Sequence, residues 1–333
     1  MKKRCLNYTV VKSLITFLLL VHFLSASTFV KAKVQLPSIL SSNMVLQQHT
    51  NVKLWGKAQK NSPITIKTSW DNKTYKTIAD KQGKWLLNIS TPVAGGPYEI
   101  TFNDGELLTL KNILIGEVWF CSGQSNMEMP MSGFDRQPTQ GTNDVIAKAK
   151  ASTPIRIYNT DSKDGKWIRQ FSKTPEEDCK GEWLENTPVN VSHTSATAYF
   201  FAQYLQEVLE VPVGIIISSL GGSKVEAWMS REAITPFKSI DLSILNNNEP
   251  IKNITATPCV LYNSKIAPFT NFTIKGFLWY QGESNRDNVD LYKDLMPVFV
   301  KDIRNKWNIG EFPFYFVEIA PCLLYTSPSP RDY

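Results

Sequence analysis

The sequence contains few histidines and cysteines, the residues that most often bind zinc and other transition metals. Histidine occurs three times in 333 residues, and none of the five cysteines forms a Cys-x-x-Cys pair. This composition argues against a structural metal site and against a disulfide framework, and we predict neither a metal nor any other cofactor. The formal net charge is +6, but no basic patch is interleaved with aromatic residues. Nucleic acid is therefore not an expected partner.

The positive charge is concentrated at the N-terminus. The first 32 residues hold five lysines and arginines and no acidic residue, so the remainder of the chain is about neutral. The apolar run Leu14–Leu24 is short for a membrane span, and small residues near Ser27 and Ala32 suit cleavage. We predict that residues 1–32 are a signal peptide of a secreted or periplasmic protein without a stable membrane anchor. A retained N-terminal anchor is the alternative.

The cysteines that would follow such a leader form an odd set. Cys121 lies inside an apolar run and is expected to be a small core residue. The sequence allows a disulfide between Cys179 and Cys259 but does not decide whether it forms.

Residues 33–112 show a period of two with frequent turn signals. Ile64 and Ile66 alternate with polar residues, as do Ile100 and Phe102. Short strands at this spacing predict a small antiparallel β-sandwich domain. We interpret it as a scaffold or a wall on the substrate side rather than as an independent lectin.

After about residue 113, apolar runs of strand length alternate with helical stripes. Helices are predicted over residues 194–210 and 291–307, and a strand over residues 312–320. Such repeats predict an α/β domain, residues 113–321, with a parallel sheet covered by helices on both faces. Residues 130–190 are predicted to be a loop-rich excursion near the site.

Polar loops follow three of the apolar runs. The runs end near Gly123, Ser219 and Tyr280, and each continues into a loop that contains glycine. The carboxyl ends of parallel strands meet at one edge of a sheet, where sites are found. Ser125 lies in the first loop, at a position that suits a nucleophile with free backbone N–H groups around it. Taken alone, Gly-x-Ser also fits an ordinary turn serine, and Met127 breaks the Gly-x-Ser-x-Gly pattern.

Together the three blocks GEVWFCSGQSNMEM, SSLGGSKVEAW and WYQGESN resemble those of sialate O-acetylesterases, a branch of the SGNH hydrolases. The resemblance covers residues 34–321 and implies a three-layer, flavodoxin-like fold. It also implies that Ser125 is the nucleophile. The oxyanion donors would be the backbone N–H groups of Ser125 and Gly222 and the side-chain amide of Asn285. Without the family, Gly222 suits an ordinary turn and Asn285 suits a helix cap.

Four further polar residues in these blocks are candidates for orienting loops or substrate hydroxyls: Gln124, Glu226, Gln281 and Glu283. Each could equally anchor backbone N–H groups of the loops. We interpret Glu283 as structural, because a carboxylate alone is a poor base for serine at neutral pH.

No residue of the sequence matches the base of the family. Family members carry an Asp-x-x-His pair well downstream, and the sequence has none; His193 precedes a helix and lacks a partner carboxylate motif. Residues 322–333 depart from the family and match the translation of a transposon-type sequencing adaptor. We therefore expect these residues to be non-native, the esterase domain to be incomplete, its Asp and His to be absent, and the chain as given to be nearly inactive.

The expected activity is that of a serine esterase. It would remove O-acetyl groups from sialic acid or related glycans through an acetyl-serine intermediate. Its partner would be an O-acetylated sugar. Acetyl xylan or another polysaccharide is an alternative substrate, and a non-catalytic carbohydrate-binding protein is the alternative of another class.

Overall fold

The computed structural model describes residues 33–160, 162–163, 166–167 and 169–319. The predicted signal peptide, residues 1–32, and the predicted non-native tail, residues 322–333, lie outside the described residues. Within the described ranges, no helix has the length and apolar character needed to cross a membrane.

Two antiparallel sheets form the N-terminal part. Their strands are β2 (Asn51–Lys57), β3 (Pro63–Thr68), β4 (Thr74–Ile78), β5 (Lys84–Ser90) and β6 (Gly95–Asn103). The short strand β1 (Val45–Gln47) precedes them and pairs parallel with β7 (Leu107–Gly123). β3 pairs with β4 and β6, whereas β2 and β5 form a separate pair. The inner faces of the two sheets share one core, in which the rings of Trp85 and Phe102 lie 5.9 Å apart. The period-two pattern therefore marks real strands, and a self-sufficient sandwich domain over residues 33–112 remains a prediction.

Strand β7 (Leu107–Gly123) belongs to both parts of the molecule. Its first half pairs antiparallel with β6, and its second half pairs parallel with β12 (Val213–Ser219). The predicted boundary between residues 112 and 113 thus falls within a continuous strand. Asn112, at that boundary, has a left-handed backbone with φ of 56°.

The second part is built on a mostly parallel sheet. Its strand order is β11–β8–β12–β7–β13–β14, and β11 alone runs antiparallel to its neighbour in this set. The strands not yet located are β8 (Ile155–Asn159), β11 (Trp183–Glu185), β13 (Gly276–Tyr280) and β14 (Phe314–Phe316). The predicted α/β class with a largely parallel sheet is confirmed.

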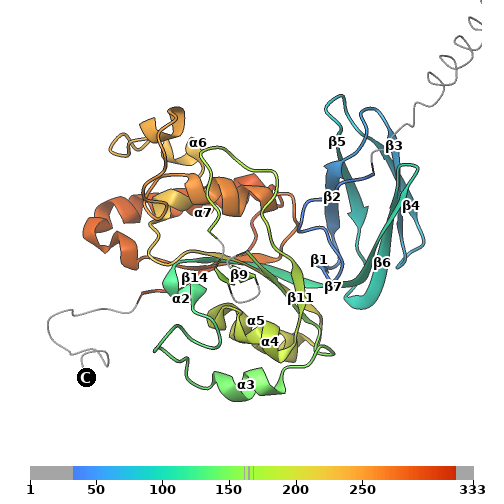
Figure 1. Cartoon of the computed structure of the whole chain (residues 1–333), viewed down its shortest axis with the longest axis horizontal. Coiled ribbons are helices and arrows are strands. Elements are labelled where there is room, and N and C mark those ends of the chain that lie inside the picture. The colour runs from blue at the N-terminus through green and yellow to red at the C-terminus, as the bar shows by residue number, and fades with distance from the viewer. Residues whose placement is uncertain (1–32, 161, 164–165, 168, 320–333) are drawn as a thin grey trace, which may run out of the picture.

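Helices cover both faces of this sheet (Figure 1). Helix α5 (Ala196–Leu209) packs on one face, where the rings of Trp119 and Phe201 lie 4.8 Å apart. Helix α7 (Val289–Trp307) packs on the other, where Phe120 and Trp307 lie 5.4 Å apart. Successive residues of a strand point to opposite faces. Trp119 therefore packs in the core under α5, and Phe120 packs in the core under α7. The site is therefore built on a sheet that is held from both sides.

The prediction of a loop-rich excursion over residues 130–190 is wrong in one respect. The segment contains β8, a fully buried strand between β12 and β11. The strand was not predicted because polar residues interrupt its apolar pattern. One of them, Arg156, is buried in the strand and forms an ion pair with Glu185 at 3.4 Å. The segment also contains α3 (Thr142–Lys148), β9 (Ser162–Lys163), β10 (Lys166–Trp167) and α4 (Pro188–Ser192).

The remaining elements are short. They are α2 (Ser125–Glu128), η1 (Val225–Trp228), α6 (Arg231–Ile234), η2 (Ser243–Asn246), η3 (Tyr262–Ile266), η4 (Ala267–Phe269) and η5 (Glu283–Asn288).

The cysteines among the described residues are buried thiols. Cys121, Cys179 and Cys259 form no disulfide with one another, so the Cys179–Cys259 bridge that the sequence left open is not formed. Burial raises the pKa of the Cys121 thiol and raises that of Cys259 to about 12. Both are inert core residues.

Candidate active site

Three strand-end loops meet at the carboxyl edge of the parallel sheet. The Gln124 N–H donates to the Tyr280 carbonyl at 2.9 Å, and the Leu220 N–H donates to the Gly123 carbonyl at 3.1 Å. A side chain at Gly123 would overlap the Tyr280 carbonyl, so only glycine lets β7 and β13 approach this closely. The loops that follow β7, β12 and β13 are thereby fixed against one another.

Ser125 is the first residue of α2 and is half-buried. Across the described part of the chain, its hydroxyl has no hydrogen-bond partner and its backbone N–H has no acceptor. A methyl group placed on Gly221 would lie 3.7 Å from the Ser125 Cβ. The hydroxyl therefore lies free beside the glycine loop that follows β12.

Gly222 adopts a left-handed backbone with φ of 72°, and open space surrounds the position where a Cβ would be. Its N–H has no acceptor among the residues that the structure describes. A backbone donor without a partner, next to a free serine hydroxyl, is what an oxyanion site requires.

The Asn285 side chain is held by three neighbours and is only 3% exposed. Its carbonyl oxygen accepts from the Val225 N–H at 3.0 Å and from Gln281 Nε2 at 2.7 Å. Its Nδ2 donates to Glu226 Oε2 at 2.8 Å. An amide nitrogen carries two hydrogens, so one remains for a ligand. The cap of α7 is Asn288, which removes the alternative role of Asn285 as that cap.

The four residues singled out beside the donors all join one loop to another. Gln124 Oε1 accepts from the Ser284 N–H at 3.2 Å, and Gln281 Nε2 also donates to the Ser223 carbonyl at 3.0 Å. Glu283 Oε1 accepts from Asn126 Nδ2 at 2.6 Å. Glu226 holds Asn285, as described above. These contacts favour an orienting role for each, and a contact with substrate remains a prediction.

Glu128 is a positioning residue that the sequence interpretation missed. It is 7% exposed, and its Oε2 accepts from the Gly221 N–H at 2.6 Å. Its Oε1 forms an ion pair with Arg169 Nη1 at 2.7 Å. A carboxylate within the otherwise apolar stretch 127–131 was the available signal, because such an acid is rarely buried without a partner.

No histidine lies in position to activate Ser125 within the described ranges. His49 is exposed in the turn between β1 and β2, and His193 is exposed at the end of α4. Neither ring makes a hydrogen bond to the Ser125 hydroxyl. The expectation that the base lies further along the natural protein stays a prediction.

The described residues also contain no group of three or more His, Cys, Asp or Glu side chains able to hold a metal ion.

Comparison with known proteins identifies the family. The model of the family described as "Carbohydrate esterase, sialic acid-specific acetylesterase" matches residues 115–327. The chain belongs to this family. The resemblance inferred from the three blocks is thus confirmed.

Curated relatives include the sialate O-acetylesterases of Mus musculus and Homo sapiens, each 27% identical to the chain. The alignments cover 87% and 85% of the chain but 61% and 56% of those proteins. The chain therefore spans about three-fifths of their length.

A solved structure, a carbohydrate acetylesterase from Xanthomonas citri, is 29% identical with a TM-score of 0.73. That likeness covers 85% of the chain and 60% of the other.

Proposed function

We propose that the protein is a serine esterase that removes O-acetyl groups from glycans, with O-acetylated sialic acids as the first substrate class. One observation carries the proposal. Among the described residues, the Ser125 hydroxyl and the backbone N–H groups of Ser125 and Gly222 have no partner, and Asn285 Nδ2 keeps one of its two hydrogens. A module that only binds sugars has no use for a nucleophile beside such donors.

The proposed reaction has two halves. Ser125 Oγ loses its proton to a base and attacks the acetyl carbonyl, whose oxygen becomes an oxyanion held by the three donors. The C–O bond to the sugar then breaks, and the proton passes to the departing sugar hydroxyl. Water repeats the sequence on the acetyl-serine and releases acetate. The base is expected to be a histidine outside the described residues.

The proposal allows more than one acetylated glycan as the substrate. Acetyl xylan and other acetylated polysaccharides would use the same chemistry at Ser125 and would differ only in contacts to the sugar. Export of the protein likewise remains a prediction that rests on residues 1–32.

The proposal is tested by replacing the nucleophile in protein expressed from the complete gene. Ser125→Ala should lower kcat for p-nitrophenyl acetate and for O-acetylated sialic acid by about 10³-fold or more. Ser132→Ala is the matched control, because Ser132 is exposed and its hydroxyl has no partner in the described structure. Undiminished hydrolysis by the Ser125→Ala protein would show that another group is the nucleophile.

A further inference from the structure

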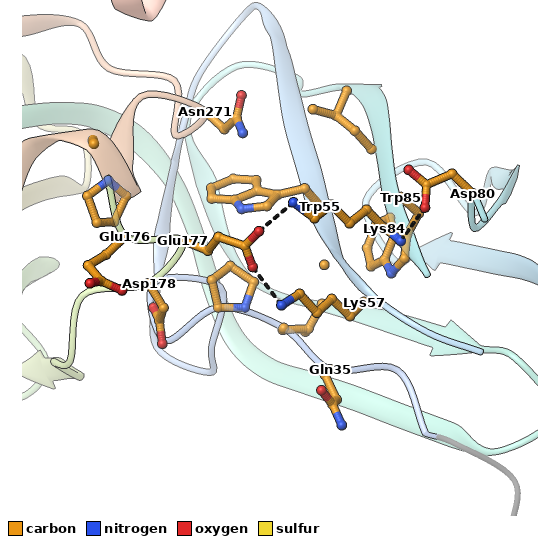
Figure 2. A pocket seen from close by; sticks show the side chains of 16 residues that line it. Gln35, Trp55, Lys57, Asp80, Lys84, Trp85, Glu176, Glu177, Asp178 and Asn271 are labelled. Carbon is orange, nitrogen blue, oxygen red and sulfur yellow. Dashed lines mark hydrogen bonds and ion pairs between the residues drawn. The ribbon is translucent and has the colours of Figure 1, made fainter. Parts of the chain in front are cut away.

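A cavity of about 620 Å³ lies between the β2–β5 sheet and the segment Glu176–Asp178 of the α/β part (Figure 2). None of its lining residues belongs to the three loops around Ser125. Strands β2 and β5 lie in the N-terminal part, well away from α2, which begins with Ser125 (Figure 1). The cavity is therefore distinct from the candidate active site.

One wall of the cavity is the outward face of the β2–β5 pair. Trp55 lies directly opposite Leu86 in the register, and Lys57 lies opposite Lys84. Residues opposite each other in an antiparallel pair point to the same side. This side faces away from the shared core, so Trp55 is only half-buried and Leu86 is 46% exposed. The wall thus presents two apolar side chains, Trp55 and Leu86, beside the lysine pair Lys57 and Lys84.

The Trp55 indole is partly buried against the hydrophobic core and keeps part of its surface in the cavity. Within the described ranges, it makes no contact with another ring and its N–H has no acceptor. Figure 2 shows the ring extending across the cavity between Glu177 and Asn271. An indole combines a broad apolar face with one hydrogen-bond donor, and such rings are common recognition groups when they lie at a surface.

The polar groups at the rim differ in what they already bind. Glu177 accepts from Lys57 Nζ at 2.6 Å and from Lys84 Nζ at 2.5 Å, so these charges satisfy one another. The side-chain amides of Asn271 and Gln35 have no hydrogen-bond partner among the residues that the structure describes. The rim therefore offers neutral donors and acceptors.

The net negative charge of the residues that line the cavity disfavours binding of anionic ligands. Four carboxylates, Asp80, Glu176, Glu177 and Asp178, face two lysines, which leaves a formal charge of −2. An anionic ligand such as a sialic acid carboxylate would be repelled, whereas an uncharged ligand would not.

We propose that this cavity binds an uncharged stretch of a glycan chain. A pyranose ring has an apolar C–H face that stacks on Trp55 and hydroxyls that bond to the amides of Asn271 and Gln35. The volume lies within the range of about 300–1,000 Å³ usual for ligand pockets. The choice of a sugar over other uncharged amphipathic molecules rests on the proposed function. The site would hold the carbohydrate chain while Ser125 acts elsewhere along it.

Direct titration with glycans that carry no ester tests the site. The probes are xylohexaose, a neutral N-acetyllactosamine tetrasaccharide, and the same tetrasaccharide capped with sialic acid, each added to the full-length protein in a calorimeter. We expect saturable binding of at least one neutral probe, and no gain in affinity from the sialic acid cap. Trp55→Ala should raise Kd by about tenfold or more, and Trp55→Phe by less.

Two further variants locate the binding. Asn271→Ala, which removes an amide contributed by the other part of the molecule, should raise Kd severalfold. Tyr204→Ala is the control, because Tyr204 is an aromatic residue that is 71% exposed on α5, and it should leave Kd unchanged. The proposal is overturned if neither neutral probe binds, if only the sialylated probe binds, or if Trp55→Ala and Asn271→Ala both bind as the unaltered protein does. Since the probes carry no ester, a failure of the proposed esterase function would not change this result.

Discussion

The orientation of Asn285 decides whether its amide can serve as a donor. Two hydrogen bonds hold its carbonyl oxygen, and a third, to Glu226, fixes one of its two N–H bonds. The remaining N–H is then directed by the protein before any ligand arrives. Such preorganisation is what makes a donor effective in a transition state.

Two variants of Glu226 separate orientation from charge. Glu226→Ala leaves the Asn285 Nδ2 without its acceptor, so kcat should fall by about tenfold or more with little change in KM. Glu226→Gln keeps an oxygen that can accept from Nδ2 and should restore most of kcat. Steady-state kinetics on a soluble acetate ester measures both. Equal losses in the two variants would show that the negative charge matters rather than the orientation.

At this scale the sequence revealed the residues that follow the strands and four of those that join the loops, but it missed Glu128. Ser125, Gly222 and Asn285 each lie in a recognisable block after an apolar run. Glu128 escaped notice because its partner Gly221 is 93 positions away in the chain. A contact of that separation leaves no local periodicity in the sequence.

Among the elements, β7 depends on a close approach at Gly116. A side chain there would overlap the Pro212 carbonyl, which also accepts from the Glu117 N–H at 2.9 Å. The glycine therefore allows β12 to begin its pairing with β7 at the residue where the parallel sheet starts.

The two glycines Gly116 and Gly141 should respond differently to an added methyl group. Gly116→Ala should lower the free energy of unfolding by about 2–3 kcal/mol, because backbone atoms would have to move. Gly141→Ala should cost about 1 kcal/mol, because its φ is 76° but open space surrounds it. Urea denaturation of both variants gives the comparison. Similar losses would contradict the packing argument at Gly116.

Helices were easier to predict than the buried strands. Helices α5 and α7 lie close to the ranges indicated by their apolar stripes, since a helix with one buried face repeats every 3.6 residues. Strand β8 has no such repeat. All five of its residues are buried, Arg156 and Asn159 included, so alternation could not mark it.

The two parts of the molecule are braced against each other by polar contacts. Asn112 Nδ2 donates to Asn43 Oδ1 at 2.7 Å and to Glu185 Oε1 at 3.0 Å. Lys57 and Lys84 of the N-terminal part both bind Glu177 of the α/β part. The sequence could suggest each part from its own periodicity, but it gave no sign of contacts between segments so far apart in the chain.

The Glu177 bridge predicts a pH dependence of stability. Hydrogen bonds from Lys57 and then Lys84 lower the pKa of Glu177 from 4.5 to about 2. A lowered carboxylate pKa stabilises the folded state above the unfolded value of 4.5, and this contribution is lost as the pH falls through about 2. Glu177→Gln should therefore reduce Tm by a few degrees at most at pH 7, because the pair is exposed.

The difference in Tm between Glu177→Gln and the unaltered protein should shrink as the pH falls from 4.5 towards 2. Thermal melts across this window measure it. A difference that stays constant, or that grows as the pH falls, would show that the carboxylate does not stabilise the fold through the lysines.

Strand β7 connects the N-terminal part to Ser125 without a linker. Its 17 residues span on the order of 50 Å, and the Asn112 contacts support it at its left-handed residue. The strand that leads to Ser125 therefore begins in the N-terminal part, so a change in how that part packs would be transmitted to the nucleophile through continuous backbone rather than absorbed by a hinge.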